Sequence, residues 1–347
     1  MKGLFDLEFH ENKIKAYHPP LSKLNKVINW DLFRDTLETA LYVKPKGAGG
    51  RPPYDKLLMF RILILQKYYN LSDEQAEFQI NDRTSFRQFL GLEIGDKIPD
   101  EKTIWVFKEK LADNNVSVKL FDLFTNQLIN QGIIAKEGSM IDASFVDVPR
   151  QRNSREDNDY IKKGAIPVSF GEKDKNGNQS RLAQKDTDAR WMTKSGERHF
   201  GYKDHINADA KTKLITKCSV SSASPHDSTE IENIVDKTDN KVHADSAYRS
   251  EKTETFLRDI HCESFVHEKG YRDYPLTEKQ KESNKKKSKI RARVEHVFGF
   301  MTNSMNDALH MRSIGIKRIK SSIGFLNLTY NLFRYEQLFR LQKVHIL

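Results

Sequence analysis

Three acidic residues stand at positions where an apolar or neutral residue is the usual choice. Asp142 and Asp245 each lie in a short run of β-forming residues, where strand propensity and burial both disfavour a carboxylate. Glu295 lies about 100° around a predicted helix from Val294, at the edge of an apolar stripe. Convergent carboxylates repel one another and raise at least one pKa unless cations lie between them. Two Mg²⁺ or Mn²⁺ ions, which prefer oxygen ligands, would remove that repulsion and could clamp both oxygens of a phosphodiester displacement.

Each aspartate taken alone has a simpler explanation. A lone aspartate in a strand is more often a cap at the strand end or an ion-pair partner than a catalytic group. The strands that carry Asp142 and Asp245 can be neighbours in the predicted sheet, and this pairing favours a shared site. The histidines between residues 199 and 243 do not have the spacing of a compact zinc site.

The net charge of +10 is concentrated in one segment. Residues 269–293 contain ten Lys or Arg against three acids, and we interpret them as a basic linker that contacts a polyanion. A run of lysines is usually a solvated surface, but the proximity to Glu295 favours contact with a DNA backbone. The predicted DNA contacts here are Lys285, Lys286, Lys287, Lys289, Arg291 and Arg293. Arg291 has a second explanation, an ion pair with Glu295 four residues later.

Four residues outside this segment are further candidates for DNA contact. Lys203 and His205 alternate along a predicted strand and therefore share one face, which faces either the metals and substrate or solvent. Trp191 lies among basic residues, so it either stacks on an unpaired base or anchors a loop. Arg249 follows the second acid closely and is placed in the same set. For His226, we favour a cap on the following helix, made through its neighbours, over substrate contact.

The N-terminal part of the chain has a helical pattern, and it differs from the strand-rich part that follows. Residues 46–56 contain glycines and a Pro-Pro pair, which predict a joint between an N-terminal arm (1–50) and a helical domain (51–132). Ser72 and Asp100 are predicted N-caps in that domain. Residues 72–90 resemble a helix-turn-helix, in which Arg83, Arg87 and Gln88 would read bases. An amphipathic helical pair of this kind is also common in a core or a dimer interface.

Residues 133–347 are predicted to form a catalytic domain with a mixed sheet. Three antiparallel strands come first, and helices then alternate with strands, which indicates an α+β or α/β arrangement. The predicted strands are 138–148, 199–209, 213–222, 241–248 and 262–268, and the predicted helices begin near residues 228, 250 and 290. Residues 148–197 are polar and interrupt the strands, so we interpret them as an insertion or mobile loop outside the core.

Several classes of protein are disfavoured. No stretch approaches the ~18 to 20 apolar residues of a membrane span, and the first residues include acids where a signal peptide needs an apolar core. Cys218 and Cys262 lack metal-ligand spacing and are expected to be small buried residues, although a disulfide between them stays open. We therefore expect a cytoplasmic, nucleoid-associated protein without a membrane partner.

An ordered set of motifs resembles one family. The motifs are GRPPYDKLLMFRILILQ, IPDEKTIW, MIDASFVDVP, DTDARWMTKSGERHFGYKDHINAD, SPHDS, HADSAYRS and RARVEHVFGFM, and they span residues 50 to about 340. In this order they are similar to DDE transposases of the insertion-sequence-five branch of the insertion-sequence-four superfamily, which have a ribonuclease-H-like catalytic domain.

The resemblance implies that Asp142, Asp245 and Glu295 are a catalytic triad that holds two Mg²⁺ or Mn²⁺ ions. It further implies that the protein binds the terminal inverted repeats of an insertion sequence, cleaves DNA strands and transfers them to target DNA. Two ends must meet one target, so a homodimer or larger assembly on double-stranded DNA is expected. Two alternatives stay open: a ribonuclease-H-like DNA nuclease without strand transfer, and a non-catalytic repressor derived from a transposase.

Overall fold

A computed structural model describes residues 9, 12–14, 16–17, 20–42, 52–93, 95–171, 182, 184–194 and 196–342. The contacts divide the chain into two compact units. The first comprises Met1–Ile133, Asn303–Ala308 and Gly324–Leu347, and the second comprises Ile134–Thr302 and Leu309–Ile323. This division differs from the predicted domains at the C-terminal end, because the last residues join the helical unit. Most of the predicted joint at 46–56 lies outside the described residues.

The first unit is helical, as its apolar periodicity predicted. Its elements are α2 (Pro20–Val27), η1 (Trp30–Phe33), α3 (Arg34–Ala40), α4 (Lys56–Tyr68), α5 (Asp73–Asp82), α6 (Thr84–Leu90), α7 (Glu101–Asp113), α8 (Val116–Asn130) and the later part of α16 (Ile316–Arg340). Aromatic rings form its core, with Phe60 next to Phe33 and Phe325 at centroid distances of 4.9 and 6.2 Å. Both predicted N-caps are confirmed, since Ser72 accepts from Gln75 N and Asp100 from Thr103 N.

The segment resembling a helix-turn-helix forms two short helices, α5 and α6, joined at Arg83. Arg87 is 6% exposed and donates to the carbonyl oxygens of Glu93 and Asp96. Its guanidinium therefore holds the loop after α6 and is not available to read bases. The side-chain nitrogen of Gln88 is buried as well, so the exposed Arg83 is the candidate that stays for such contacts.

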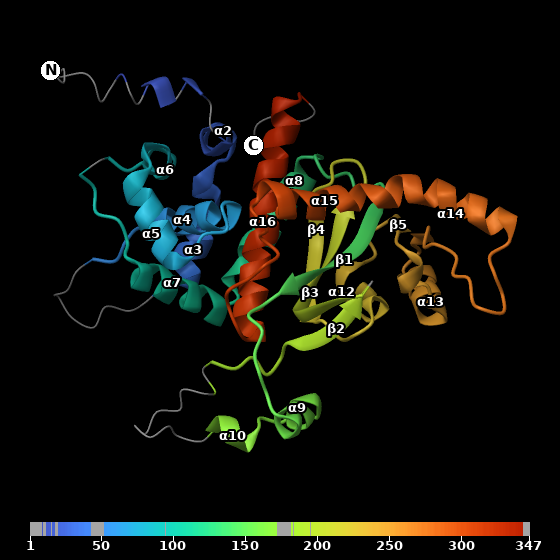
Figure 1. Cartoon of the computed structure of the whole chain (residues 1–347). Helices are drawn as coiled ribbons and strands as arrows, with labels where there is room; N and C mark the ends of the chain where they lie inside the picture. Colours follow the sequence, from blue (N-terminus) through green and yellow to red (C-terminus); the bar gives the residue numbers. More distant parts are fainter. Residues whose placement is uncertain are drawn as a thin grey trace. The chain divides into compact units, whose positions relative to one another are not determined.

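The second unit contains a six-stranded mixed sheet (Figure 1). Its strands are β1 (Ser139–Asp147), β2 (Arg190–Lys194), β3 (Glu197–Asp209), β4 (Ile215–Ser222), β5 (Lys241–His243) and β6 (Glu263–Ser264). The order is β2-β3-β1-β5-β6, and β4 also pairs with β3. β1, β3 and β4 are antiparallel, whereas β5 is parallel to β1 and β6 to β5. The prediction that the strands carrying Asp142 and Asp245 can be neighbours is thus confirmed.

One glycine lets the two central strands approach each other. Gly201 in β3 has φ +155°, and a Cβ at this position would overlap the carbonyl oxygen of Val146 in β1. Only glycine leaves room for that backbone contact, so the register of β1 against β3 depends on it.

Helices and helical turns lie between and after the strands. They are α9 (Arg155–Lys162), α10 (Val168–Gly171), η2 (Asp227–Glu230), α12 (Ile231–Ile234), η3 (Ser246–Tyr248), α13 (Glu251–Asp259), α14 (Glu278–Arg291), η4 (Ala292–Val294), α15 (Glu295–Gly299) and the π-helical η5 (Phe300–Ser304). α12 and α13 bury an apolar cluster against the sheet that includes Ile141, Ile231, Val242 and Leu257. Since neighbouring residues of a strand alternate between faces, Ile141 faces this core and Asp142 faces the other way.

Three element predictions were wrong, and a fourth, the strand 262–268, is confirmed only at Glu263–Ser264. The insertion at 148–197 contains α9, α10 and the strand β2, and buries Ile161, Phe170 and Ala189, although part of it lies outside the described residues. The predicted strand 241–248 ends at His243, because Asp245 caps η3. Most of the predicted linker is the helix α14, which begins at a capping box between Thr277 and Gln280.

Two further observations concern the predicted absence of a membrane span and the state of the two cysteines. In the described part of the chain, no helix combines the length and apolar character needed to cross a bilayer. No disulfide joins Cys218 and Cys262, and Cys262 is buried as expected, whereas Cys218 is only partly buried.

Candidate active site

The parallel pairing of β1 and β5 brings two of the three acids to one edge of the sheet. Met140 in β1 pairs with His243 in β5. Asp142 lies two residues after the first of these partners and Asp245 two residues after the second. Parallel strands run in the same direction, so both carboxylates lie beyond the same pair. The stretch of α14 and η4, which leads to the third acid at the start of α15, passes across this end of the sheet (Figure 1).

Asp142 is held in a largely buried position. Its side chain is 14% exposed, Oδ1 accepts from Ala143 N at 2.9 Å, and Oδ2 lies 2.8 Å from Arg291 Nη2. Burial raises the pKa of Asp142 to about 6, against the opposing effect of Arg291, and Glu295 and Asp245 contribute in the same direction as burial. Arg291 contacts both Asp142 and Glu295, and the β1–β5 register sets Asp142 and Asp245 beyond the same residue pair, so the three acids share one end of the sheet.

Asp245 and Glu295 enter the site from the starts of two helices. Asp245 is the N-cap of η3 and accepts from Ala247 N at 2.8 Å. Such a local bond competes with strand pairing, which explains why β5 stops before this residue. Glu295 is the first residue of α15 and is 57% exposed. Val294 and Val297 beside it are fully buried, so the predicted apolar stripe and its edge are confirmed at these positions.

Arg291 lies between two of the acids. Nη1 is 3.0 Å from Glu295 Oε1, and Nη2 bonds Asp142, so one guanidinium bridges two carboxylates. The predicted ion pair with Glu295 is confirmed, and a second pair joins it.

The donor set can be tested against a divalent ion. Within the described residues, no three His, Cys, Asp or Glu side chains are gathered tightly enough to enclose a metal. The three acids nevertheless supply only oxygen donors, which suits Mg²⁺ or Mn²⁺, and a cationic group already lies between two of them. The residues therefore fit such an ion, provided that Arg291 moves away from the carboxylates.

Two residues near the acids were missed by the sequence reasoning. His267 is half-buried, and burial lowers its pKa, with Arg291 acting in the same direction and Asp245 against it. Tyr248 is 1% exposed, and its hydroxyl has no hydrogen-bond partner among the described residues. Burial raises the pKa of Tyr248 well above its ordinary value, so the phenol stays neutral. The sequence offered one weak signal for each residue. Tyr248 lies three residues after Asp245, and His267 lies shortly after a predicted β-forming run begins.

The structure does not bring Lys203 and His205 to the acids. Phe145 and Ala143 pair with them, so their side chains leave the sheet on the face opposite Asp142. Lys203 is 5% exposed and lies 2.8 Å from Asp227, while His205 is fully buried and bonds Ser221. Both side chains are engaged in the interior, which leaves them no surface for DNA.

The buried histidines lead to a prediction about acid stability. Burial lowers the pKa of His205 and of His243 to about 4, so both rings are neutral when folded and protonate on unfolding below about pH 6.5. The free energy of unfolding should fall by about 1.4 kcal/mol per histidine for each pH unit from 6.5 towards 4. Thermal denaturation between pH 7 and 5 measures this. His205→Asn should remove its own contribution, about 1.4 kcal/mol per pH unit, from that slope. His296→Gln at an exposed position is the comparison variant, and a slope in His205→Asn equal to that of the wild type would contradict the assignment.

His226 caps η2 as favoured, but by its own ring. Its Nδ1 lies 2.8 Å from Ser228 Oγ and accepts weakly from Ser228 N. The neighbours Asp227 and Ser228 are not the capping acceptors.

Trp191 borders a cavity of about 470 Å³ in the second unit. The indole is 48% exposed, packs on Phe200 at 5.0 Å, and has the guanidinium of Arg150 at 5.7 Å from its ring. Ile161 and Lys162 of α9 line the same cavity. The mixture of an aromatic ring and cations suits a nucleotide, and the packing on Phe200 also suits an anchor, so both interpretations of Trp191 stay open.

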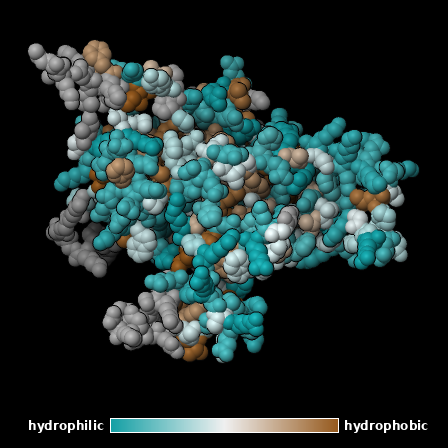
Figure 2. Space-filling view, viewed as in Figure 1, coloured by the Kyte–Doolittle hydropathy of each residue, from teal (hydrophilic) through white to brown (hydrophobic). Residues whose placement is uncertain are grey.

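The basic residues of α14 divide between two faces. Lys285, Lys286 and Lys289 are exposed, and Lys286 pairs with Glu282 at 3.0 Å. Lys287 is 13% exposed and forms an ion pair with Glu268. Arg249, which lies outside α14, pairs with the same carboxylate. Figure 2 shows a largely hydrophilic surface over this helix.

The helical region followed by a mixed sheet with flanking helices is the arrangement of an α+β, ribonuclease-H-like DDE domain. Residues 135–332 match the transposase DDE domain family, and residues 8–110 match a second family, described as transposase domain (DUF772). The first match covers more than half of the chain, so the protein belongs to the DDE transposase family. No solved structure matched the chain in a structural search. The finer resemblance to the insertion-sequence-five branch stays a prediction.

Proposed function

We propose that this protein cleaves DNA at the ends of a mobile element and joins the resulting 3′-hydroxyl groups to a target phosphodiester, with Mg²⁺ or Mn²⁺ as cofactor. The observation that carries the proposal is the placement of Asp142, Asp245 and Glu295 at one end of the sheet of a DDE transposase domain, where the β1–β5 register and the contacts of Arg291 hold them. Oxygen-only donors in this setting favour phosphodiester chemistry over the other reactions of acidic sites.

Each acid would have a distinct part in holding the ions. Asp142 is fixed by the sheet and by Ala143 N, so it would be a rigid ligand. Asp245 is fixed by its turn, and Glu295 is exposed enough to adjust its side chain. When bound, the two ions would activate the attacking oxygen and neutralise charge on the leaving oxygen. Arg291 would then exchange its two carboxylates for a DNA phosphate, which keeps its charge paired throughout.

The exposed lysines of α14 are the proposed backbone contacts. Each lysine that neutralises a phosphate releases a counterion, so the logarithm of the DNA affinity falls steeply with the logarithm of the salt concentration. Changing Lys285, Lys286 and Lys289 together to Gln should reduce that slope by about 2 to 3 and weaken binding at low salt. Fluorescence anisotropy with a labelled duplex across a salt series measures it. Lys237→Gln, far from α14 along the chain, is the control, and an unchanged slope in the triple variant would place the DNA elsewhere.

The functional test begins with the DNA beside the gene. Short inverted repeats that flank it supply candidate substrates, and incubation with the protein and Mg²⁺ should cut at their ends. A nuclease without strand transfer would cut but never join these ends to a target plasmid. A repressor would bind the repeats without metal-dependent nicking. Because two ends must be joined to one target, we also propose that two or more copies act together on DNA.

A further inference from the structure

The helix α14 has an unusual attachment to its domain. It spans Glu278–Arg291 and contains no buried residue, so apolar packing does not hold it. Residues facing the domain recur at helical spacing: Asn284, Lys287, Ser288 and Arg291. All four are polar and all four are hydrogen-bonded. The helix that leads to Glu295 is therefore docked on its domain by polar contacts.

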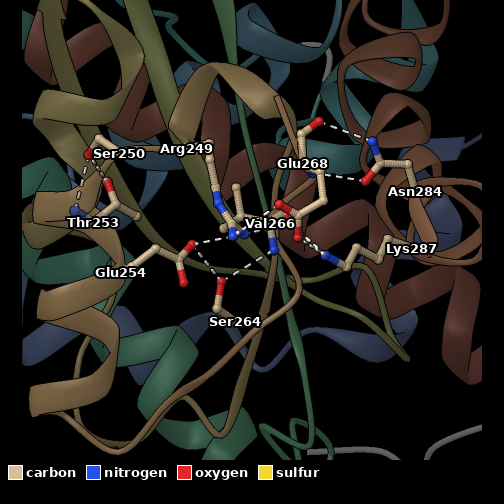
Figure 3. Close-up of polar contacts among 9 residues, drawn as sticks. All are labelled: Arg249, Ser250, Thr253, Glu254, Ser264, Val266, Glu268, Asn284 and Lys287. Atoms are coloured by element: carbon tan, nitrogen blue, oxygen red, sulfur yellow. Dashed lines mark hydrogen bonds and ion pairs between the residues drawn. The ribbon is translucent and has the colours of Figure 1, made fainter. Parts of the chain in front are cut away.

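Two of these four residues, Asn284 and Lys287, contact Glu268 (Figure 3). Its backbone N–H donates to Asn284 Oδ1 at 2.8 Å, and its carbonyl oxygen accepts from Asn284 Nδ2 at 3.0 Å. Its carboxylate lies 3.4 Å from Lys287 Nζ and 3.1 Å from Arg249 Nη2. Lys287 also donates to the carbonyl oxygen of Val266 at 2.8 Å.

The two cations on Glu268 come from the two segments that carry catalytic candidates. Arg249 lies four residues after Asp245, and Lys287 lies four residues, about one helical turn, before Arg291. Arg249 is fixed from the other side by Glu254 at 3.2 Å. One carboxylate thus ties the segment of Asp245 to the helix that carries Arg291 and continues into Glu295.

We propose that Glu268 is a positioning residue for the transposase reaction: it fixes the docked pose of α14 and so sets the placement of Arg291 and Glu295 against Asp142 and Asp245. This inference rests on the proposed function. It also reassigns Arg249 and Lys287, predicted from the sequence as DNA contacts, to the docking of the helix. Since positioning errors of an ångström are costly in catalysis, the loss of one docking charge acts on the chemical step.

Glu268→Gln tests the proposal, with Glu282→Gln as a matched control. Both substitutions remove one glutamate charge that pairs with a lysine of α14, but Glu282 is exposed and pairs with Lys286 on the outer face. In the Glu268 variant, kcat for end cleavage should fall about tenfold while KM for DNA changes less than about twofold. The Mn²⁺ concentration for half-maximal binding, followed by electron paramagnetic resonance, should rise about tenfold. The control should match wild type in kcat and in Mn²⁺ binding.

Hydrogen exchange of α14 separates this proposal from the proposed function. Amides of residues 284–291 should exchange faster in Glu268→Gln than in Glu282→Gln, whether or not the protein cleaves DNA. Adding Lys287→Met to Glu268→Gln should lower kcat by less than the product of the two single effects, because the two side chains share one ion pair. Equal exchange and equal Mn²⁺ binding in the two single variants would overturn the positioning role. If the two variants differ in exchange as expected but the wild-type protein cuts no DNA end, the proposed function alone would be overturned.

Discussion

Asp142→Asn should reduce metal-dependent DNA cleavage by about 10³-fold or more while leaving DNA binding nearly unchanged. The substitution keeps the size of the side chain and its bond to Ala143 N, but removes the negative charge that a divalent ion requires. Asp245→Asn and Glu295→Gln should have the same effect. Gel assays with an end-labelled duplex measure cleavage, and anisotropy measures binding.

Asp147→Asn is a matched control for this prediction. It is the same substitution on the same strand, but Asp147 pairs with His199 at 3.2 Å and is not among the groups that influence Asp142. Its cleavage rate should stay within about threefold of wild type, as for a substitution outside the reacting groups. Full cleavage by Asp142→Asn, or equal losses in both variants, would show that the three acids do not form the reactive site.

Arg291→Ala should make the stability of the protein depend on divalent ions. Without metal, removal of the guanidinium leaves a largely buried carboxylate facing two other acids, and the free energy of unfolding should fall by about 2 kcal/mol. Mn²⁺ should recover most of that loss, because it supplies positive charge at the position that the guanidinium occupied. Mn²⁺ should therefore raise the Tm of the variant more than that of wild type.

Arg293→Ala is the comparison for this second prediction. Arg293 lies two residues away and donates only to the carbonyl oxygen of Lys211 among its hydrogen bonds in the described residues. Its loss should leave both the metal-free Tm and the response to Mn²⁺ close to wild type. If Mn²⁺ shifts the Tm of Arg291→Ala no further than that of wild type, the guanidinium does not lie at a metal position.

Much of the fold could be predicted because its signals are local. The apolar periodicity of the helical region, the caps Ser72 and Asp100, and the hairpin formed by β3 and β4 depend on residues close in sequence. The closeness of Asp142 and Asp245 was predictable in principle, because strand order in a mixed sheet allows few arrangements.

Other features depend on long-range contacts that residue types do not reveal. The face on which Lys203 and His205 lie is set by the register of β3 against β1, which a single sequence does not specify. α14 has no apolar stripe, so the charged sequence predicted a linker where the structure has a helix. Arg249 and Lys287 looked like DNA contacts because the carboxylate that binds them, Glu268, lies on a different segment. His267 was not predicted for the same reason, because the groups near it lie on other segments of the chain.

The strand-transfer reaction tests the central claim most directly. Duplexes that carry the element end with an exposed 3′-hydroxyl are incubated with the protein, a target plasmid and Mg²⁺, and joined products are separated by size. Wild-type protein should form plasmid species that carry the labelled end, Asp142→Asn should form none, and omission of Mg²⁺ should abolish them. Hydrolysis of the DNA without any joined product, or joining that persists in Asp142→Asn, would contradict the account.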